Sequence, residues 1–390
     1  MNKEELFEVI AEIDEMKVKA AREPVRRKKK ARWLKWGALA ACVCVCAVGV
    51  AARLHQATSG MEGDLPTLTL SMTWGGMGYE GYLYYDISEW DSGSPWESGK
   101  EYDALPVFRN GSYNVIGIPV GLDKETMQAR AKIVAEKLGM EILELREQAV
   151  GETFEGSGVG ADALTQLEAV TADAVIRVQG DGTVTVDFGD GRKLPEEFNM
   201  THHTADEEEA ATVLDYLLEA YSELLEMEQP EKVLFWERNI YGQVVRSYGV
   251  YEGAGGELED LLNYHFNYVQ FAPDDDGELM LIRLHDGLAC AEKIGDYPII
   301  SQRQALELLL NGNYAASVPY AIEGAGNVAG VELVYRCGNA EQVFLPYYRF
   351  FVELPEELRN GELKSYGAYY VPAVEGRYIK NMPTYDGRFN

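Results

Sequence analysis

The sequence predicts an α+β protein with a single N-terminal transmembrane helix, followed by an extracytoplasmic body of antiparallel sheets and a few capped helices. An apolar run without charge directly follows a cluster of basic residues near the N-terminus. The rest of the chain alternates capped helix patterns with blocks of short strand patterns, which indicates α+β rather than a strict strand–helix–strand repeat. The net charge also changes sign between these two parts.

Charge is divided unevenly along the chain. The 390 residues include 35 basic and 64 acidic side chains, which gives a net charge of −29. Up to Trp36 there are 11 basic and 7 acidic residues, a balance of +4, and the remainder has a balance of −33. So acidic a body would repel phosphate backbones, and this argues against nucleic acid as a partner.

The apolar run, which has no charge from Trp36 to Ala52, predicts a transmembrane helix over residues 33–52. A helix of that length spans about 30 Å, the thickness of the hydrocarbon core. Basic flanks remain in the cytoplasm, so the N-terminus is predicted inside and the body outside. The residues predicted at the membrane interface, with the bilayer as partner, are Arg26, Arg27, Lys28, Lys29, Lys30, Arg32, Trp33, Lys35 and Trp36.

Two other fates of this segment remain open. Residues 50–52 would satisfy a signal peptidase, although a cleaved signal peptide has a much shorter basic region before its apolar run. Residues 39–42 match a lipoprotein cleavage box, but the apolar run continues beyond the cysteine. The simplest interpretation treats the three cysteines of the run as small apolar residues: Cys42, Cys44 and Cys46.

The cytoplasmic tail, residues 1–32, contains an amphipathic helix pattern ahead of its basic cluster. A short helix of this kind is marginal in water, so its apolar stripe is expected to bury itself. A cytoplasmic protein could bind this stripe; the alternatives are a helix resting on the bilayer surface and a frayed tail. The stripe consists of Leu6, Val9, Ile10, Ile13 and Met16.

A polar linker, residues 53–66, leads to a body that is long enough for two subdomains, predicted at 67–200 and 201–390. Helix start and stop signals mark segments 124–138 and 205–228, and a short helix over 305–310. The last of these follows a Ser301–Gln304 capping box.

Strand patterns fill most of the remaining body. The strongest hairpin signal joins 174–179 to 183–188 through Gly180-Asp181-Gly182. Further strands are predicted at 67–73, 105–108, 113–119, 141–148, 164–171, 233–238, 244–251, 266–271, 279–284, 331–336, 343–352 and 366–374.

Candidate metal and redox residues have simple interpretations. The adjacent histidines at 202–203 precede a helix and read as a solvated loop. The acidic run 274–277 reads as a hairpin tip, because His285 stands where a calcium loop needs its final glutamate. A disulfide between Cys290 and Cys337 stays open.

Aromatic residues gather in three clusters of strand patterns. On such strands they pack into the core or, alternatively, form an exposed face for a peptide or glycan. The clusters are Tyr79, Tyr82, Tyr84 and Tyr85; Tyr347, Tyr348, Phe350 and Phe351; and Tyr366, Tyr369 and Tyr370.

A resemblance covers part of the C-terminal region. Its residues are Tyr297-Pro298, Ser301, Gln304-Ala305-Leu306, Leu309, Asn313-Tyr314, Val331 to Tyr335 and Leu345 to Phe350. This stretch resembles the PepSY-like regulatory modules of bacterial envelope proteins and the YycH/YycI group of membrane-anchored kinase regulators. The whole layout is similar to that of surface proteins of Gram-positive anaerobes. The resemblance implies a binding or regulatory role without cofactors.

The sequence contains neither a nucleophile elbow nor a phosphate-binding loop. We therefore expect a membrane-anchored extracytoplasmic binding or regulatory protein without catalytic activity, whose outer partner is a protein or a cell-wall component. Two alternatives remain: a cell-envelope hydrolase, and an anti-sigma-type regulator that uses the N-terminal cytoplasmic helix.

Overall fold

The computed structural model describes residues 65–70, 84–87, 92–151, 158–198, 200, 207–234, 236–238, 244–253, 255–359 and 361–387. Apart from Leu65 and Pro66, these residues belong to one compact unit, Thr67–Asn390. The predicted cytoplasmic tail 1–32 and transmembrane helix 33–52, with their partner-binding and membrane-interface residues, lie outside the described residues. Within the described residues, no helix combines the length and the apolar composition that crossing a membrane requires.

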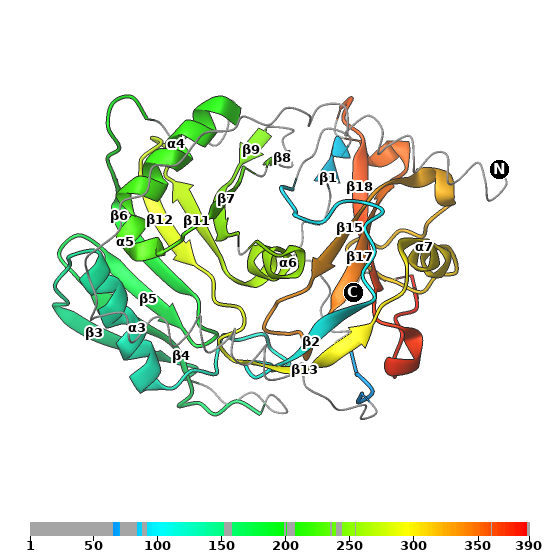
Figure 1. Ribbon diagram of the computed structural model, residues 1–390, viewed down its shortest axis with the longest axis horizontal. Helices are drawn as coiled ribbons and strands as arrows, with labels where there is room; N and C mark the ends of the chain where they lie inside the picture. Colours follow the sequence, from blue (N-terminus) through cyan, green and yellow to red (C-terminus); the bar gives the residue numbers. More distant parts are fainter. Residues whose placement is uncertain are drawn as a thin grey trace. The chain divides into compact units, whose positions relative to one another are not determined.

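The described part of the chain has the predicted α+β architecture, with few helices and with named strands that pair antiparallel (Figure 1). The largest sheet has eight strands in the order β3-β4-β5-β6-β12-β11-β10-β7, and it takes strands from both sides of residue 200. Their bounds are β3 Glu144–Ala149, β4 Leu164–Val170, β5 Val175–Gln179, β6 Val184–Arg192, β7 Pro230–Val233, β10 Tyr248–Glu252, β11 Tyr268–Pro273 and β12 Leu279–Leu284.

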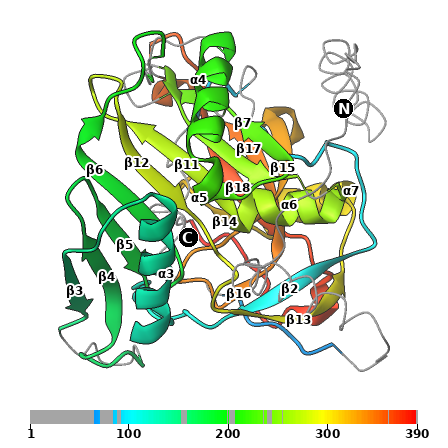
Figure 2. The same cartoon turned by 60° about the vertical axis from the view of Figure 1, so that its left-hand side comes forward.

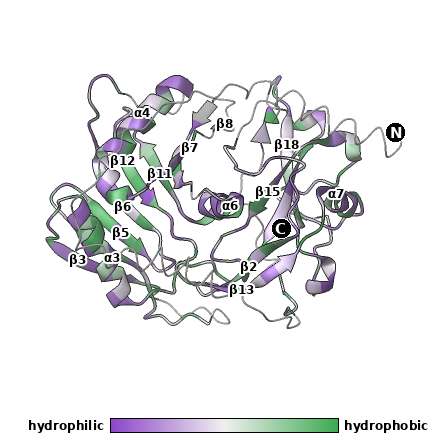
Figure 3. Ribbon diagram, in the orientation of Figure 1, coloured by the Kyte–Doolittle hydropathy of each residue, from purple (hydrophilic) through white to green (hydrophobic). Residues whose placement is uncertain are grey.

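One face of the eight-stranded sheet is apolar and is covered by helices. Alternate residues of its strands point to that side, and they pack with α3 (Lys124–Lys137), α4 (Glu207–Ala220) and α5 (Ser222–Leu225) in one core. Figure 2 shows these helices on one side of the sheet, and Figure 3 shows apolar colour on the central strands β5 and β6. Burial of each large side chain contributes about 1.5–3 kcal/mol. Fully buried strand residues include Leu167, Ile176, Val186, Phe271 and Ile282.

The second sheet has five strands, with β14 pairing with β18 beside the path β1-β18-β17-β15. Smaller sheets join β13, β2 and β16, and β8 and β9. Helix α6 packs against β10 and β11, and α7 packs against β18. The bounds are β1 Tyr84–Tyr85, β2 Ala104–Asn110, β8 Trp236–Arg238, β9 Val244–Arg246, α6 Glu257–Phe266, β13 Ala291–Pro298, α7 Gln302–Leu310, β14 Ala315–Ala316, β15 Val328–Tyr335, β16 Val343–Phe344, β17 Pro346–Glu353 and β18 Ser365–Pro372, with short 3₁₀ turns at Ala325–Asn327, Glu356–Leu358 and Gly376–Tyr378.

Strands β17 and β18 are buried on both faces. All eight residues of β18 are buried, and so are six of the eight in β17. Core packing is therefore confirmed for the described aromatic clusters, and they form no exposed aromatic face. The buried aromatic residues are Tyr84, Tyr85, Tyr347, Tyr348, Phe350, Phe351, Tyr366, Tyr369 and Tyr370.

The helix predictions succeed where capping residues are clear. The side chain of Asp123 accepts a hydrogen bond from Thr126 N–H at the start of α3, and α7 begins with the predicted Ser301–Gln304 box. The long helix predicted over 205–228 is interrupted at Tyr221, which separates α4 from α5.

Two elements were not predicted, and the strand predicted at 113–119 does not form. Residues 257–266 form α6, which the sequence analysis did not identify, and 291–298 form the unpredicted strand β13. Residues 113–119, predicted as a strand, form turns, because Asn114 binds the chain back on itself: its side chain accepts from Ile118 N–H and donates to Ile118 O.

Candidate functional site

The other face of the eight-stranded sheet is polar. Directly paired residues lie on the same face of a sheet, so the strand register identifies each row of side chains. One row crosses β4, β5, β6, β12 and β11 as Glu168, Arg177, Thr185, Arg283 and Gln270. A row of this composition would not be placed against an apolar core.

A second polar row lies two residues further along the same strands. Gln166 pairs with Gln179, whose N–H donates to Thr183 O (2.8 Å). Across the sheet, His285 N–H donates to Tyr268 O (2.9 Å). The rings of these two residues stack with centroids 4.1 Å apart. The two rows together make a surface of amides, hydroxyls, charges and one aromatic stack.

A cavity of about 480 Å³ lies over part of this polar face. This volume is within the usual range for small-molecule sites, about 300–1,000 Å³. The sheet provides Gln179, Thr183, Thr185, Tyr268, Arg283 and His285. The remaining lining residues come from elements around the sheet. They are Asn110 and Ser112 at the end of β2, Asp181 in the β5–β6 turn, His265 and Phe266 of α6, Gly287 after β12, Cys337, Gly338 and Asn339 in the β15–β16 connection, and Phe344 of β16.

Helix α6 brings His265 and Phe266 to the cavity. Its apolar stripe ends in Phe266, whose ring contacts Phe108, Tyr335 and Phe344 at centroid distances of 5.7, 5.1 and 5.6 Å. These contacts link α6 to β2, β15 and β16, and α6 lies between the large sheet and β15 in Figure 1. Packing of the helix end thus fixes the position of His265.

Hydrogen bonds of Asp181 hold one edge of the cavity together. This residue lies in the β5–β6 turn that the sequence predicted. One carboxylate oxygen accepts from Thr183 N–H (3.0 Å), and the other accepts from the side-chain amide of Asn339 (3.0 Å). On the same edge, the Asn110 amide donates to Glu341 O (2.8 Å). The β5–β6 turn and the end of β2 are therefore both hydrogen-bonded to the β15–β16 connection.

Two glycines allow the backbone segments at this edge to approach closely. A Cβ at Gly111 would lie 2.2 Å from Cys290 O, and one at Gly180 would lie 2.4 Å from Pro119 O. Such distances are too short for any other residue without a backbone shift. The glycines therefore position Ser112 and Asp181 beside the cavity.

Arg283 differs from Arg146 and Arg177, which lie on the same face: Arg146 is paired with Glu144 (2.7 Å). Arg177 is paired with Glu168 (3.1 Å) and with Asp187. Arg283 has neither an ion pair nor a side-chain hydrogen bond with the rest of the described chain. Its guanidinium therefore remains available on the cavity side of β12.

Both cavity histidines are held neutral. Burial, together with the charge of Arg349, lowers the pKa of His265 to about 3, and burial with the charge of Arg283 lowers that of His285 to about 4. The His265 ring hydrogen-bonds to the backbone of Leu333. The Nε2 atoms of both rings are buried and have no hydrogen-bond partner among the described residues.

Both cysteines of the described chain are free thiols. Cys337 lines the cavity and its Sγ donates to Tyr335 O (3.5 Å). The Sγ of Cys290 donates to Gly180 O (3.6 Å), and burial raises the pKa of this thiol. The disulfide that the sequence left open is absent from the structure.

Of the two candidate metal sites in the sequence, the structure describes the acidic run 274–277. Asp274 Oδ1 accepts from Asp276 N–H and Glu278 N–H (both 2.9 Å), so the acidic run is a hairpin tip. No group of three or more His, Cys, Asp or Glu in the described parts could hold a metal ion. The histidines at 202–203 lie outside these parts.

The residues that build the cavity were not predicted from the sequence. One signal was present in β12 and its end, where Arg283 and His285 occupy alternate positions after an otherwise apolar strand. Polar residues at alternate positions of a central strand indicate a polar face. No comparable signal marks His265, because its position depends on how α6 packs.

Comparison with known proteins adds no assignment to this geometry. The chain matches no protein-family model, and it matches none of the curated proteins either.

Proposed function

We propose that this chain is a membrane-anchored extracytoplasmic binding protein, and that the cavity over the polar face is its binding site. The observation that carries the proposal is the meeting of unpartnered polar groups in one cavity: the guanidinium of Arg283 and the Nε2 atoms of His265 and His285. Buried polar groups are normally hydrogen-bonded, so a bound polar molecule would complete this set.

The proposed anchoring rests on the sequence. The balance of +4 up to Trp36 against −33 in the remainder favours a cytoplasmic N-terminus and an outer body. A binding protein placed there would meet ligands of the cell envelope, and a regulatory role in the manner of PepSY-like modules would pass ligand occupancy to a membrane partner.

Anchoring is tested with epitopes at both ends of the full chain. Protease added to intact spheroplasts should remove the C-terminal epitope and leave the N-terminal epitope, and alkaline carbonate should leave the protein in the membrane fraction. A C-terminal epitope that survives while a known outer protein is digested would contradict the proposed topology.

Ligand binding is tested with a variant that fills the cavity. The full chain in detergent is screened by thermal shift against sugars, sugar acids, amino acids and short peptides. Thr185→Trp places an indole on the cavity floor and should abolish any rise in unfolding temperature that a compound causes in the wild type. Gln166→Trp is the matched control, since Gln166 lies on the same face without lining the cavity. If no compound shifts the wild type, or if both variants respond like the wild type, the cavity is not the binding site.

A cell-envelope hydrolase is the second candidate, because the cavity holds two histidines with perturbed pKa values and the thiol of Cys337. Histidines with pKa values of about 3 and 4 are weak general bases at neutral pH, which favours binding. Release of soluble fragments from purified cell-wall material by the wild type, with loss of release in His285→Gln, would favour the hydrolase instead.

A further inference from the structure

The charge of the cavity is concentrated on one side chain. Arg283 is the one arginine or lysine among the described residues that line the cavity. The carboxylate of Asp181 is already engaged by Thr183 N–H and by the Asn339 amide. A guanidinium without a counter-ion binds carboxylate or phosphate oxygens through two parallel hydrogen bonds. Arg283 therefore favours a ligand with one oxyanion.

Neutral hydrogen-bonding groups surround this arginine. Thr185 is its direct cross-strand partner, and Thr183 and Gln179 follow in the next row. The side chains of these three residues make no hydrogen bond to other described residues. Hydroxyls and amides both donate and accept, which suits the hydroxyl groups of a ligand.

Aromatic surface completes the cavity lining. Phe266 and Phe344 belong to the wall, and Tyr268 stacks on His285 at 4.1 Å. Flat aromatic faces next to polar groups pack against the C–H faces of a ring whose edge carries hydroxyls. An oxyanion site, neutral hydrogen-bonding groups and aromatic faces are thus brought together within one cavity.

We infer that the cavity binds an acidic sugar, with the carboxylate or phosphate of the sugar against Arg283 and its hydroxyls against Thr183, Thr185 and Gln179. This inference rests on the proposed binding function and names its ligand class. A cationic ligand would be repelled by Arg283, and an apolar ligand would leave the guanidinium desolvated and unpaired.

The test uses four probes that share one pyranose ring: glucuronate, glucose 6-phosphate, glucose and glucosamine. Their dissociation constants are measured by calorimetry with the full chain in detergent. Glucuronate or glucose 6-phosphate should bind about tenfold or more tighter than glucose, because hydrogen bonds between two charged groups are stronger than those made by a neutral hydroxyl. The better of the two acids shows whether a carboxylate or a phosphate is preferred.

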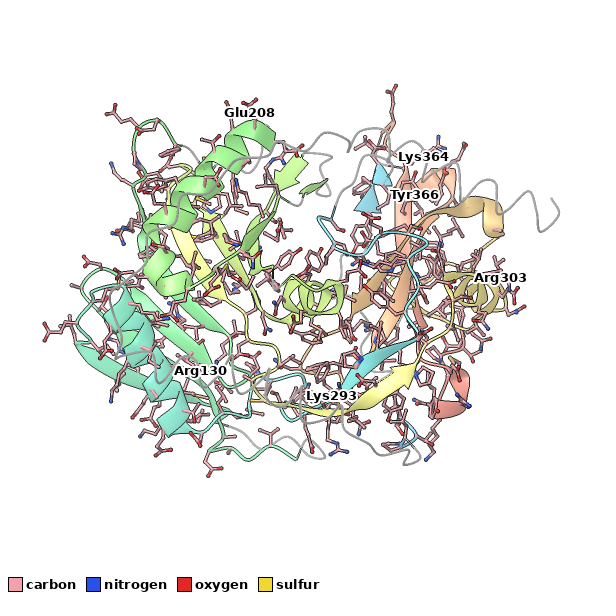
Figure 4. All side chains as sticks on the ribbon, viewed as in Figure 1. Arg130, Glu208, Lys293, Arg303, Lys364 and Tyr366 are labelled. Atoms are coloured by element: carbon pink, nitrogen blue, oxygen red, sulfur yellow. The ribbon has the colours of Figure 1, made fainter. Side chains whose placement is uncertain are left out.

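Two variants test whether Arg283 causes the preference for acidic sugars over glucose. Arg283→Gln should bring the acidic sugars down to the affinity of glucose. Arg303→Gln removes the same charge from an exposed position of α7, where Figure 4 shows its side chain pointing outward, and should keep the preference. In the wild type, raising NaCl from about 0.05 M to about 1 M should shrink the preference, a result that needs no variant.

Acidic sugars that bind no tighter than glucose, or a preference that survives Arg283→Gln in folded protein, would overturn the inference. If another compound raises the unfolding temperature of the wild type and Thr185→Trp abolishes that rise, the proposed binding function holds although the ligand is not an acidic sugar. If no compound of the wider screen gives such a rise, the binding function fails as well.

Discussion

The central strands of the two large sheets differ in how many of their faces are buried. In the five-stranded sheet, β17 and β18 are buried on both faces and filled with aromatic side chains. In the eight-stranded sheet, β6 and β12 bury one face under helices and turn the other, with Thr185 and Arg283, toward a cavity. The first arrangement gives stability, and the second gives a rigid floor on which functional groups can be placed.

The difference has a physical origin in the neighbouring elements. A sheet covered on both sides excludes water, so any polar side chain there would need a buried partner. The polar face of the eight-stranded sheet is covered only partly, by the end of α6 and the β15–β16 connection, and this leaves a cavity. The eight-stranded sheet therefore has one face in a core and one face toward a cavity, whereas the central strands of the five-stranded sheet have both faces buried.

Truncation of a central aromatic residue should cause the largest loss in the free energy of unfolding. Phe350 in β17 is 1% exposed and is paired with Tyr369 of β18. Phe350→Ala should lower the free energy of unfolding by about 3–5 kcal/mol, because it removes apolar burial and leaves a cavity. Thr185→Ala on the polar face is the control and should change it by less than about 1 kcal/mol. Denaturant unfolding measures both, and equal losses would contradict the division between the sheets.

Acid should destabilise the region of the cavity. Unfolded histidines have a pKa near 6.5, whereas those of folded His265 and His285 are about 3 and 4. Below pH 6.5 the unfolded chain therefore binds more protons, so stability is complete above pH 6.5 and falls toward pH 4. From pH 7.5 to pH 5 each histidine should remove about 2 kcal/mol.

The variant His285→Gln separates this effect from other titrations. Its free energy of unfolding, measured at the same two pH values, should fall by about 2 kcal/mol less than that of the wild type. Arg283 and Asp181 are the charged residues that act on His285, and both remain in the variant. An unchanged pH dependence would show that the pKa of His285 in the folded protein is close to that of a solvated histidine.

Local signals explain which parts of the fold could be predicted. The caps of α3 and α7 and the β5–β6 turn depend on residues close in sequence, and all three are confirmed. Helix α6 was missed although Leu261, Leu262 and Phe266 have helical spacing, because its N-cap is Gly256, which has no side chain to form a cap. Strand β13 was missed because its residues do not alternate clearly between apolar and polar.

The candidate site was less predictable than the fold. Arg283 and His285 could have been found from their alternate positions at the end of β12. Asn110, His265 and Asn339 could not, since they are far apart in the sequence and meet only after α6 and the β15–β16 connection pack against the sheet. Sequence patterns describe faces of single elements, whereas this cavity lies where several elements far apart in the sequence converge.

Breaking the bond across the cavity edge should have a moderate effect. Asn339→Ala removes the donor to Asp181 Oδ2 and should lower the free energy of unfolding by about 1 kcal/mol. Asn327→Ala in the 3₁₀ turn before β15 is a control away from this edge. Hydrogen exchange should also rise at residues 180–183 and 337–339 in Asn339→Ala alone. Unchanged exchange there would mean that the edge is held by other contacts.

The smallest effect is expected at β3, where the difference between the two faces disappears. Every residue of this edge strand is exposed. Leu145 points to the apolar side, opposite Ala169, yet it is 38% exposed. Leu145→Ala should therefore change the free energy of unfolding by no more than about 0.5 kcal/mol. Leu167→Ala, which truncates a fully buried leucine of the neighbouring strand, should lower it by about 2–5 kcal/mol. A comparable loss in both variants would show that the apolar face continues to the sheet edge, and that β3 is covered by a surface of this protein or of a partner.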